Sequence, residues 1–198
     1  MQSAFPDSSG LTHQPSRALS ETGLGRITIA FAATLFVAAC AHVSIPLPFT
    51  PVPLTLQNFG VLLVGLLLGP AAGFSAMALY LAEGALGLPM FNPHSTGGIV
   101  QLLGPTGGYL LSYPFVAAVA GWVFRSLRLG STYARATIAC ALATFVLFAC
   151  GSLWIAQILH LGASGVWTMS IAPFLPGEAV KIAAAAGLAA SIEHWRRA

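Results

Sequence analysis

The sequence predicts an all-α membrane protein that crosses the bilayer as six transmembrane helices. Hydrophobic residues make up 57% of the 198 residues and charged residues only 7%, whereas soluble domains carry about 25% charged residues. Apolar runs that approach the roughly 20 residues needed to cross a bilayer recur along the chain. Because so few charges cannot cover a surface that faces water, we predict a multi-pass membrane protein.

The N-terminal segment, residues 1–25, is polar and rich in serine, so we expect a flexible cytosolic tail ahead of one six-helix transmembrane domain, residues 26–198. Arg17 and Arg26, followed by an apolar run that ends near Cys40, also resemble a lipoprotein signal peptide. We interpret this run as the first span, since the rest of the chain is itself membrane-spanning.

The expected spans differ in length. In order, they are residues 27–45, 54–68, 70–88, 105–125, 135–160 and 173–195. The second is short, about 22 Å of helix, and the fifth is long enough to include an interfacial turn near its end. Pro70, Pro105 and Pro176 suit the first helical turn and indicate the starts of the third, fourth and sixth spans.

The arginines indicate how the bundle is oriented. They precede the first span, surround the connection between the fourth and fifth spans, and follow the sixth. The connections at residues 46–53, 89–104 and 161–172 contain no Lys or Arg. Cytoplasmic loops carry an excess of these residues, so we expect both termini in the cytosol and these three connections outside.

Two of the external connections have unusual compositions. Four prolines between Pro46 and Pro53 fix the backbone in an extended, stiff segment. The next connection contains two glycine pairs, which permit tight turns or close approach of the backbone to a bound molecule. These pairs are Gly97 with Gly98 and Gly107 with Gly108. Both connections are therefore candidates for the roof of a pocket.

The stretch PFLPGEAVK, residues 173–181, places two charges at the outer end of the last span. Glu178 and Lys181 are three residues apart and share one helix face. Charged side chains at membrane depth usually face the bundle interior or a wet cavity. Either the two neutralise each other at the interface, or they form the polar floor of a pocket for a compact ligand that carries both N–H and C=O groups.

Further polar residues are candidates for the same pocket. Gln57, His94, Thr96 and Tyr109 all lie in or beside the external connections. Residues of these types are more often local caps or interfacial groups than ligand contacts. Glu83 is another intramembrane acid, for which we expect a position at the external interface, with a proton or ion site as the alternative.

Other function classes receive little support. The scattered arginines form no basic stripe for nucleic acid. The three cysteines have no metal-ligand spacing, so we predict no metal site. Residues 162–165 fit the Gly-x-Ser-Gly pattern of intramembrane proteases, but His194 lies about one membrane thickness from Ser164 and His160 is merely near in sequence. We therefore predict that the protein is not an enzyme.

Four motifs in order resemble those of the BioY family, the biotin-capturing S components of energy-coupling-factor (ECF) transporters in prokaryotes. They are PVPLTLQNFG at 51–60, GLPMF at 87–91, GPTGGYL at 104–110 and PFLPGEAVK at 173–181. The resemblance implies a six-helix bundle in the prokaryotic cell membrane with an external biotin pocket and no cofactor. It also implies energisation by a transmembrane coupling subunit and two cytosolic ATPases.

The resemblance also implies roles for individual residues. Lys181 and the acid at 178 match the pair that contacts the ureido ring of biotin, although the family usually has Asp where this chain has Glu178. Leu110 stands where some members place an Arg for the biotin carboxylate, which leaves backbone N–H groups, His94 or Lys181 for that task. Thr96 stands where some members use Asn.

Aromatic and small residues complete the expected sites. Phe49, Phe91 and Tyr109 are candidates to pack the apolar parts of biotin. Ala30, Thr34 and Ala38 form a small-residue stripe, which suits either packing within the bundle or docking of another helix. The resemblance favours docking of the coupling subunit. The alternative function is a secondary carrier for another small vitamin, with Glu83 coupling transport to protons.

Overall fold

The computed structural model describes residues 23–197, and helices dominate it. Its longer helices are α1 (Gly23–His42), α2 (Gln57–Leu68), α3 (Pro70–Ala85), α5 (Gly107–Ser126), α6 (Thr132–Ile158) and α8 (Leu175–Arg197). Its short elements are β1 (Ser44–Ile45), β2 (Leu54–Thr55), α4 (Gly98–Leu103), α7 (Ala163–Val166) and a π-helical turn, η2 (Trp167–Ile171). The expected helical class is confirmed for this part of the chain.

Length divides the helices into two groups. Four of those described, α1, α5, α6 and α8, are long and apolar enough to cross a membrane. The 12 residues of α2 and the 16 of α3 extend only about 18 Å and 24 Å. The structure thus supports a membrane protein with four candidate spans, and the count of six remains a prediction.

Several expected boundaries need correction. α1 begins at Gly23, inside the segment expected to be a tail, and residues 1–22 of that tail lie outside the described residues. The second expected span began at residue 54, but residues 54–55 form β2, which pairs antiparallel with β1. Pro70 and Pro176 do lie in first helical turns, whereas Pro105 precedes the N-cap residue of α5 and so lies outside that helix.

The expected external connections contain short structured elements. The proline-rich segment is closed at its base by the β1–β2 pair, in which Ser44 faces Thr55. The glycine-rich segment contains α4, whose start requires positive φ values at Gly97 (67°) and Gly98 (61°). Glycine adopts such values without steric cost, which explains this pair of glycines.

The core forms around α5, which contacts α2, α3 and α6. α2 and α5 approach closely because Gly65 has no side chain, and a Cβ atom there would lie 2.4 Å from the Ala117 carbonyl oxygen. α8 packs against α2 and α6 and thereby brings its first turn to the same core. This packing positions the polar residues described below.

The small-residue stripe of α1 faces the chain's own core. Thr34 is fully buried and Ala38 is 7% exposed, while Ala30 is partly buried against the core cluster. The Thr34 hydroxyl donates a hydrogen bond to the Phe31 carbonyl within the helix. This burial favours packing within the bundle over docking of a partner through these residues.

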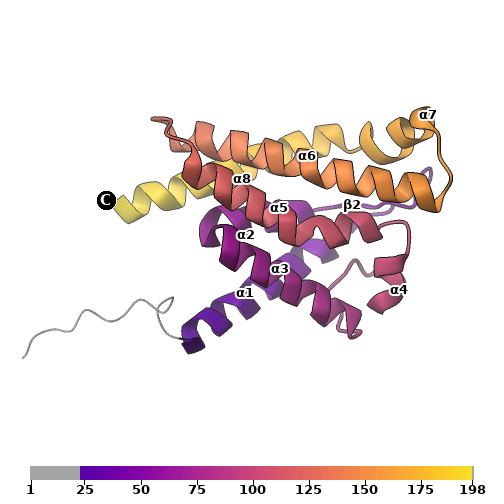
Figure 1. Ribbon diagram of the computed structural model, residues 1–198, viewed down its shortest axis with the longest axis horizontal. Helices are drawn as coiled ribbons and strands as arrows, with labels where there is room; N and C mark the ends of the chain where they lie inside the picture. Colours follow the sequence, from indigo (N-terminus) through magenta and orange to yellow (C-terminus); the bar gives the residue numbers. More distant parts are fainter. Residues whose placement is uncertain (1–22, 198) are drawn as a thin grey trace, which may run out of the picture.

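The two ends of the bundle differ in character (Figure 1). The α5–α6 connection lies at the same end as the C-terminal part of α8, whereas α4, α7 and the strand pair lie at the other end. At the first end, Arg135 forms an ion pair with Glu193 at 3.2 Å, and the Arg125 guanidinium donates a hydrogen bond to the Leu68 carbonyl. The arginines of the α5–α6 connection thus lie opposite the uncharged connections.

Candidate ligand pocket

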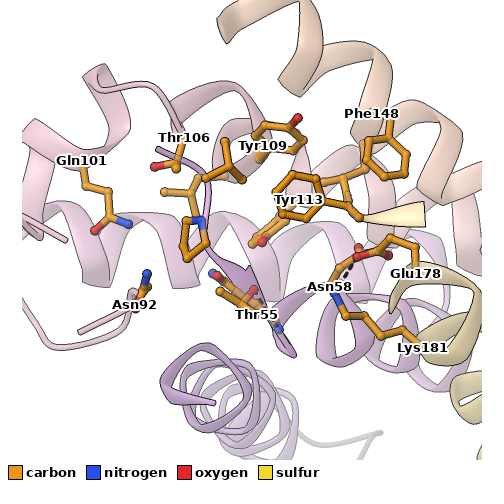
Figure 2. A pocket seen from close by; sticks show the side chains of 16 residues that line it. Thr55, Asn58, Asn92, Gln101, Thr106, Tyr109, Tyr113, Phe148, Glu178 and Lys181 are labelled. Carbon is orange, nitrogen blue, oxygen red and sulfur yellow. Dashed lines mark hydrogen bonds and ion pairs between the residues drawn. The ribbon is translucent and has the colours of Figure 1, made fainter. Parts of the chain in front are cut away.

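A pocket opens at the end of the bundle that holds the strand pair and α4 (Figure 2). Its cavity volume is about 70 Å³, and it is open to the outside at one side. Its apolar lining residues are Val52, Pro53, Leu110, Leu147, Phe148 and Phe174. Its polar, charged and tyrosine residues are Thr55, Gln57, Asn58, Asn92, Gln101, Thr106, Tyr109, Tyr113, Glu178 and Lys181.

One end of the pocket is formed by a charged cluster from α8 and α2. The first two turns of α8 place Glu178 and Lys181 on one face, and the Lys181 Nζ atom donates to Glu178 Oε1 at 2.6 Å. Asn58 of α2 donates its Nδ2 to Glu178 Oε2 at 2.5 Å. The two charged residues are 6% and 8% exposed, so this ion pair is buried in the pocket wall.

The oxygens of Glu178 are both satisfied within this cluster. A buried carboxylate is tolerated when a countercharge and hydrogen-bond donors satisfy its oxygens, and each Glu178 oxygen has one such partner. Its place in the first turn of α8 adds the favourable field of the helix N-terminus. Lys181 uses one of its three donors on Glu178, which leaves donors for a ligand. Glu178 and Lys181 thus form an ion pair with each other and also line the pocket; contact with a ligand stays a prediction.

Asn58 was not among the residues that the sequence indicated. Its Nδ2 contacts Glu178 and, at 3.4 Å, the Thr144 hydroxyl, whereas its buried Oδ1 has no hydrogen-bond partner among the described residues. A polar pair, Gln57 and Asn58, at the start of an otherwise apolar helix was the available signal. Its partner on α8 is 120 residues away, which sequence spacing does not reveal.

Gln57 and Tyr109 line the pocket as expected, but both are also tied to the protein. Gln57 Nε2 donates to the Tyr80 hydroxyl at 2.7 Å, and that hydroxyl donates to the Met90 carbonyl at 2.6 Å. The Tyr109 hydroxyl contacts both the side chain and the carbonyl of Ser170. These bonds hold the pocket wall in place, and direct contact of either residue with a ligand stays a prediction.

The remaining predicted residues lie outside this pocket. Phe91 is buried and packs edge-on against Tyr80, with ring centroids 5.6 Å apart, and Phe49 is 53% exposed. His94 and Thr96 line a neighbouring cavity. The two cavities share Pro53, Asn92, Gln101 and Thr106. The structure therefore separates these four predicted residues from Glu178 and Lys181.

Glu83 is buried near the end of α3 with 8% exposure. Its Oε2 atom has no hydrogen-bond partner among the described residues, and it does not line the main pocket. Protein surrounds this side chain, and its expected position at the external interface stays a prediction. Ser164 and His194, the residues of the protease alternative, lie in α7 and in the last turns of α8, about 30 Å of helix apart.

Comparison with known proteins identifies the family. The sequence model described as "BioY family" matches residues 13–198. The chain belongs to the BioY family. A probable biotin transporter BioY of Pyrococcus horikoshii is 37% identical over 160 residues, covering 80% of this chain and 92% of that relative. A biotin transporter BioY of Rhizobium etli is 33% identical, covering 84% and 90%.

A solved structure shares the fold of this BioY family member. It is the crystal structure of the S-component for biotin from an ECF-type ABC transporter. The TM-score is 0.77 with 24% sequence identity, and the match covers 85% of this chain and 90% of that chain. The two chains therefore share a helical fold, while the count of six spans and their orientation stay predictions.

Proposed function

We propose that this protein captures biotin for uptake into the cell. The observation that carries the proposal is the cluster of Lys181, Glu178 and Asn58, which combines a donor and two acceptors in the wall of the pocket. The relatives named as biotin transporters and the similar fold of a biotin S-component support the same ligand.

The chemistry of the pocket complements that of biotin. The ureido ring has one C=O acceptor and two N–H donors. Lys181 Nζ retains donors for the C=O group, while Glu178 and the unpartnered Asn58 Oδ1 are acceptors for the N–H groups. Apolar side chains such as Leu147 and Phe174 line the same pocket and suit the sulfur ring and the aliphatic chain. The protein binds and releases biotin without chemical change, so it is not an enzyme.

The arrangement in the membrane and the partners are part of the proposal. We place the protein in the prokaryotic cell membrane with six spans, both termini in the cytosol and the pocket outside. The arginine-bearing α5–α6 connection at the opposite end from the pocket supports this orientation. A transmembrane coupling subunit and a pair of cytosolic ATPases would energise uptake, as the S-component fold suggests.

The decisive experiment measures biotin directly. Mass spectrometry of the purified protein is expected to detect co-purified biotin, and calorimetry of the stripped protein is expected to show tight binding. Glu178→Ala and Lys181→Ala should each abolish that binding, whereas Thr137→Ala, on the exposed part of α6, should leave it unchanged. Unchanged affinity in both pocket variants would refute the site.

Glu83 supports a second candidate, a secondary carrier that couples solute movement to protons. The observation in its favour is a buried carboxyl whose Oε2 lacks a partner among the described residues, which is a suitable group for binding a proton. Uptake would then depend on a pH gradient, and Glu83→Gln would remove that dependence. Uptake that is insensitive to the gradient in the wild-type protein would exclude the carrier.

A further inference from the structure

The end of the pocket opposite the charged cluster carries polar side chains but no charge. Figure 2 shows Asn92, Gln101 and Thr106 at this end, with Glu178 and Lys181 at the other. Asn92 and Gln101 are buried, with 5% and 6% exposure. Their orientation decides what kind of ligand group could bind there.

The orientation of the Asn92 amide follows from its partners. Its Oδ1 accepts hydrogen bonds from the backbone N–H of His94 at 3.0 Å and from the Ser44 hydroxyl at 2.9 Å. Because a backbone N–H only donates, the atom facing it must be the amide oxygen. The Ser44 and His94 contacts therefore use the oxygen of the Asn92 amide. Its NH₂ group remains, and no described residue accepts a hydrogen bond from it.

One further donor accompanies Asn92. Thr106 occupies the N-cap position of α5, yet its hydroxyl makes no capping hydrogen bond. Gln101 adds a neutral amide, but its partner does not fix which end faces the pocket, because the single Ser95 hydroxyl hydrogen is shared between the Asn92 carbonyl at 2.6 Å and Gln101 at 2.7 Å. This end of the pocket thus presents uncommitted donors from Asn92 and Thr106 beside a neutral amide.

The charged end has the reverse pattern. Asn58 uses its NH₂ group on Glu178 and leaves its oxygen, the acceptor, without a partner. Among the sixteen lining residues the one base, Lys181, is bonded to the one acid, Glu178, at 2.6 Å. Formal charge in the lining therefore sums to zero. His94 lines only the neighbouring cavity, and its Nδ1 faces the Asn92 oxygen at 3.2 Å and the Ser44 hydroxyl at 3.0 Å.

We propose that Asn92 and Thr106, with the neutral Gln101 amide beside them, form a neutral donor subsite for the acceptor group at the end of the ligand's tail. This inference rests on the proposed function, so the acceptor is the carboxylate of biotin. Neutral donors bind a carboxylate more strongly than an amide carbonyl, but burying the anion without a countercharge offsets that gain. The negative charge of the tail therefore adds little to affinity, and the subsite also accepts tails that end in a neutral carboxamide.

The test compares biotin with biotinamide, which keeps a carbonyl acceptor but lacks the charge. Calorimetry on the full-length protein in detergent is expected to give dissociation constants that differ by less than about tenfold, because the two kinds of hydrogen bond differ by about that factor. A larger preference for biotin would show that a positively charged group of the protein binds the carboxylate, and would overturn the subsite.

Asn92→Asp sharpens the test because it keeps the oxygen that Ser44 and His94 need and replaces the donor with a negative charge. It should weaken biotin binding at least tenfold more than biotinamide binding, since only biotin brings a second carboxylate to this end. Asn58→Asp, at the ureido end, should weaken both ligands equally. Gln101→Glu repeats the test if the melting temperature shows that Asn92→Asp is unfolded.

The outcomes separate this subsite from the proposed function. Tight biotin binding with a ratio that changes less than tenfold in the folded aspartate or glutamate variant would overturn the subsite alone. No biotin binding to the wild-type protein would overturn the proposed function and the subsite together.

Discussion

Two buried carboxyl groups show how differently this bundle treats the same side chain. Glu178 of α8 is 6% exposed and receives hydrogen bonds from Lys181 and Asn58. Glu83 of α3 is 8% exposed, and its Oε2 receives none from the described residues. Their burial is nearly equal, so the difference lies in their partners.

This difference separates a carboxyl group that has a charged partner and an amide donor from one whose Oε2 has neither among the described residues. Buried polar groups are tolerated best when hydrogen bonds satisfy them. The paired group lines the pocket and the unpaired group does not. Removing or adding partners therefore tests whether pairing, and not burial, makes the Glu178 region suitable for binding.

The largest effect is expected from Lys181→Met, which gives Glu178 the unpaired state of Glu83. Breaking a buried pair from one side costs about 3–5 kcal/mol, so we expect a marked loss of thermal stability in detergent together with loss of biotin binding in calorimetry. The double variant Lys181→Met, Glu178→Gln should recover stability but not binding. Equal stability of the single and double variants would show that the pair is not buried as described.

A moderate effect is expected from Glu178→Asp, which withdraws the carboxylate by one methylene from Asn58. Weakening one charge-assisted hydrogen bond costs about 1–2 kcal/mol, or about tenfold or more in the biotin dissociation constant by calorimetry. Asn58→Ala should then weaken biotin binding less in the Glu178→Asp variant than in the wild-type protein. Equal costs in both backgrounds would mean that Asn58 and Glu178 act independently.

A smaller effect is expected from Glu83→Gln. Neutralising a carboxyl that has no charged partner should change the free energy of unfolding by less than about 1 kcal/mol and leave biotin affinity unaltered. The matched variant is Glu178→Gln, which should lose binding. Calorimetry measures the biotin affinity of both variants, and thermal unfolding measures their stability. Loss of binding in Glu83→Gln as well would contradict the distinction between the two carboxyl groups.

The smallest effect is expected from Thr144→Val, which removes the 3.4 Å contact with Asn58. This distance is at the long limit for a hydrogen bond, so the cost should be within about 0.5 kcal/mol and biotin affinity should change about twofold or less. Calorimetry checks this value. A loss as large as that of Glu178→Asp would assign Thr144 a direct part in orienting Asn58.

Local sequence patterns predicted the charged half of the pocket. Glu178 and Lys181 are three residues apart after a helix-starting proline, so their shared face follows from helix geometry alone. The polar residues at the other end were missed because Asn92 and Gln101 lie in a connection where polar residues are common. Phe49 and Phe91 were predicted as pocket residues from their chemistry, but one is exposed and the other packs on Tyr80.

The sequence by itself determined that the chain is helical, apolar and a BioY family member, because composition, proline placement and the charge pair at 178 and 181 are local properties. Only the tertiary structure decided which way the Asn58 and Asn92 amides face, and that Glu178 has Asn58 as its second partner. Those features depend on partners as far as 120 residues apart, and chain folding alone brings such groups within hydrogen-bond distance.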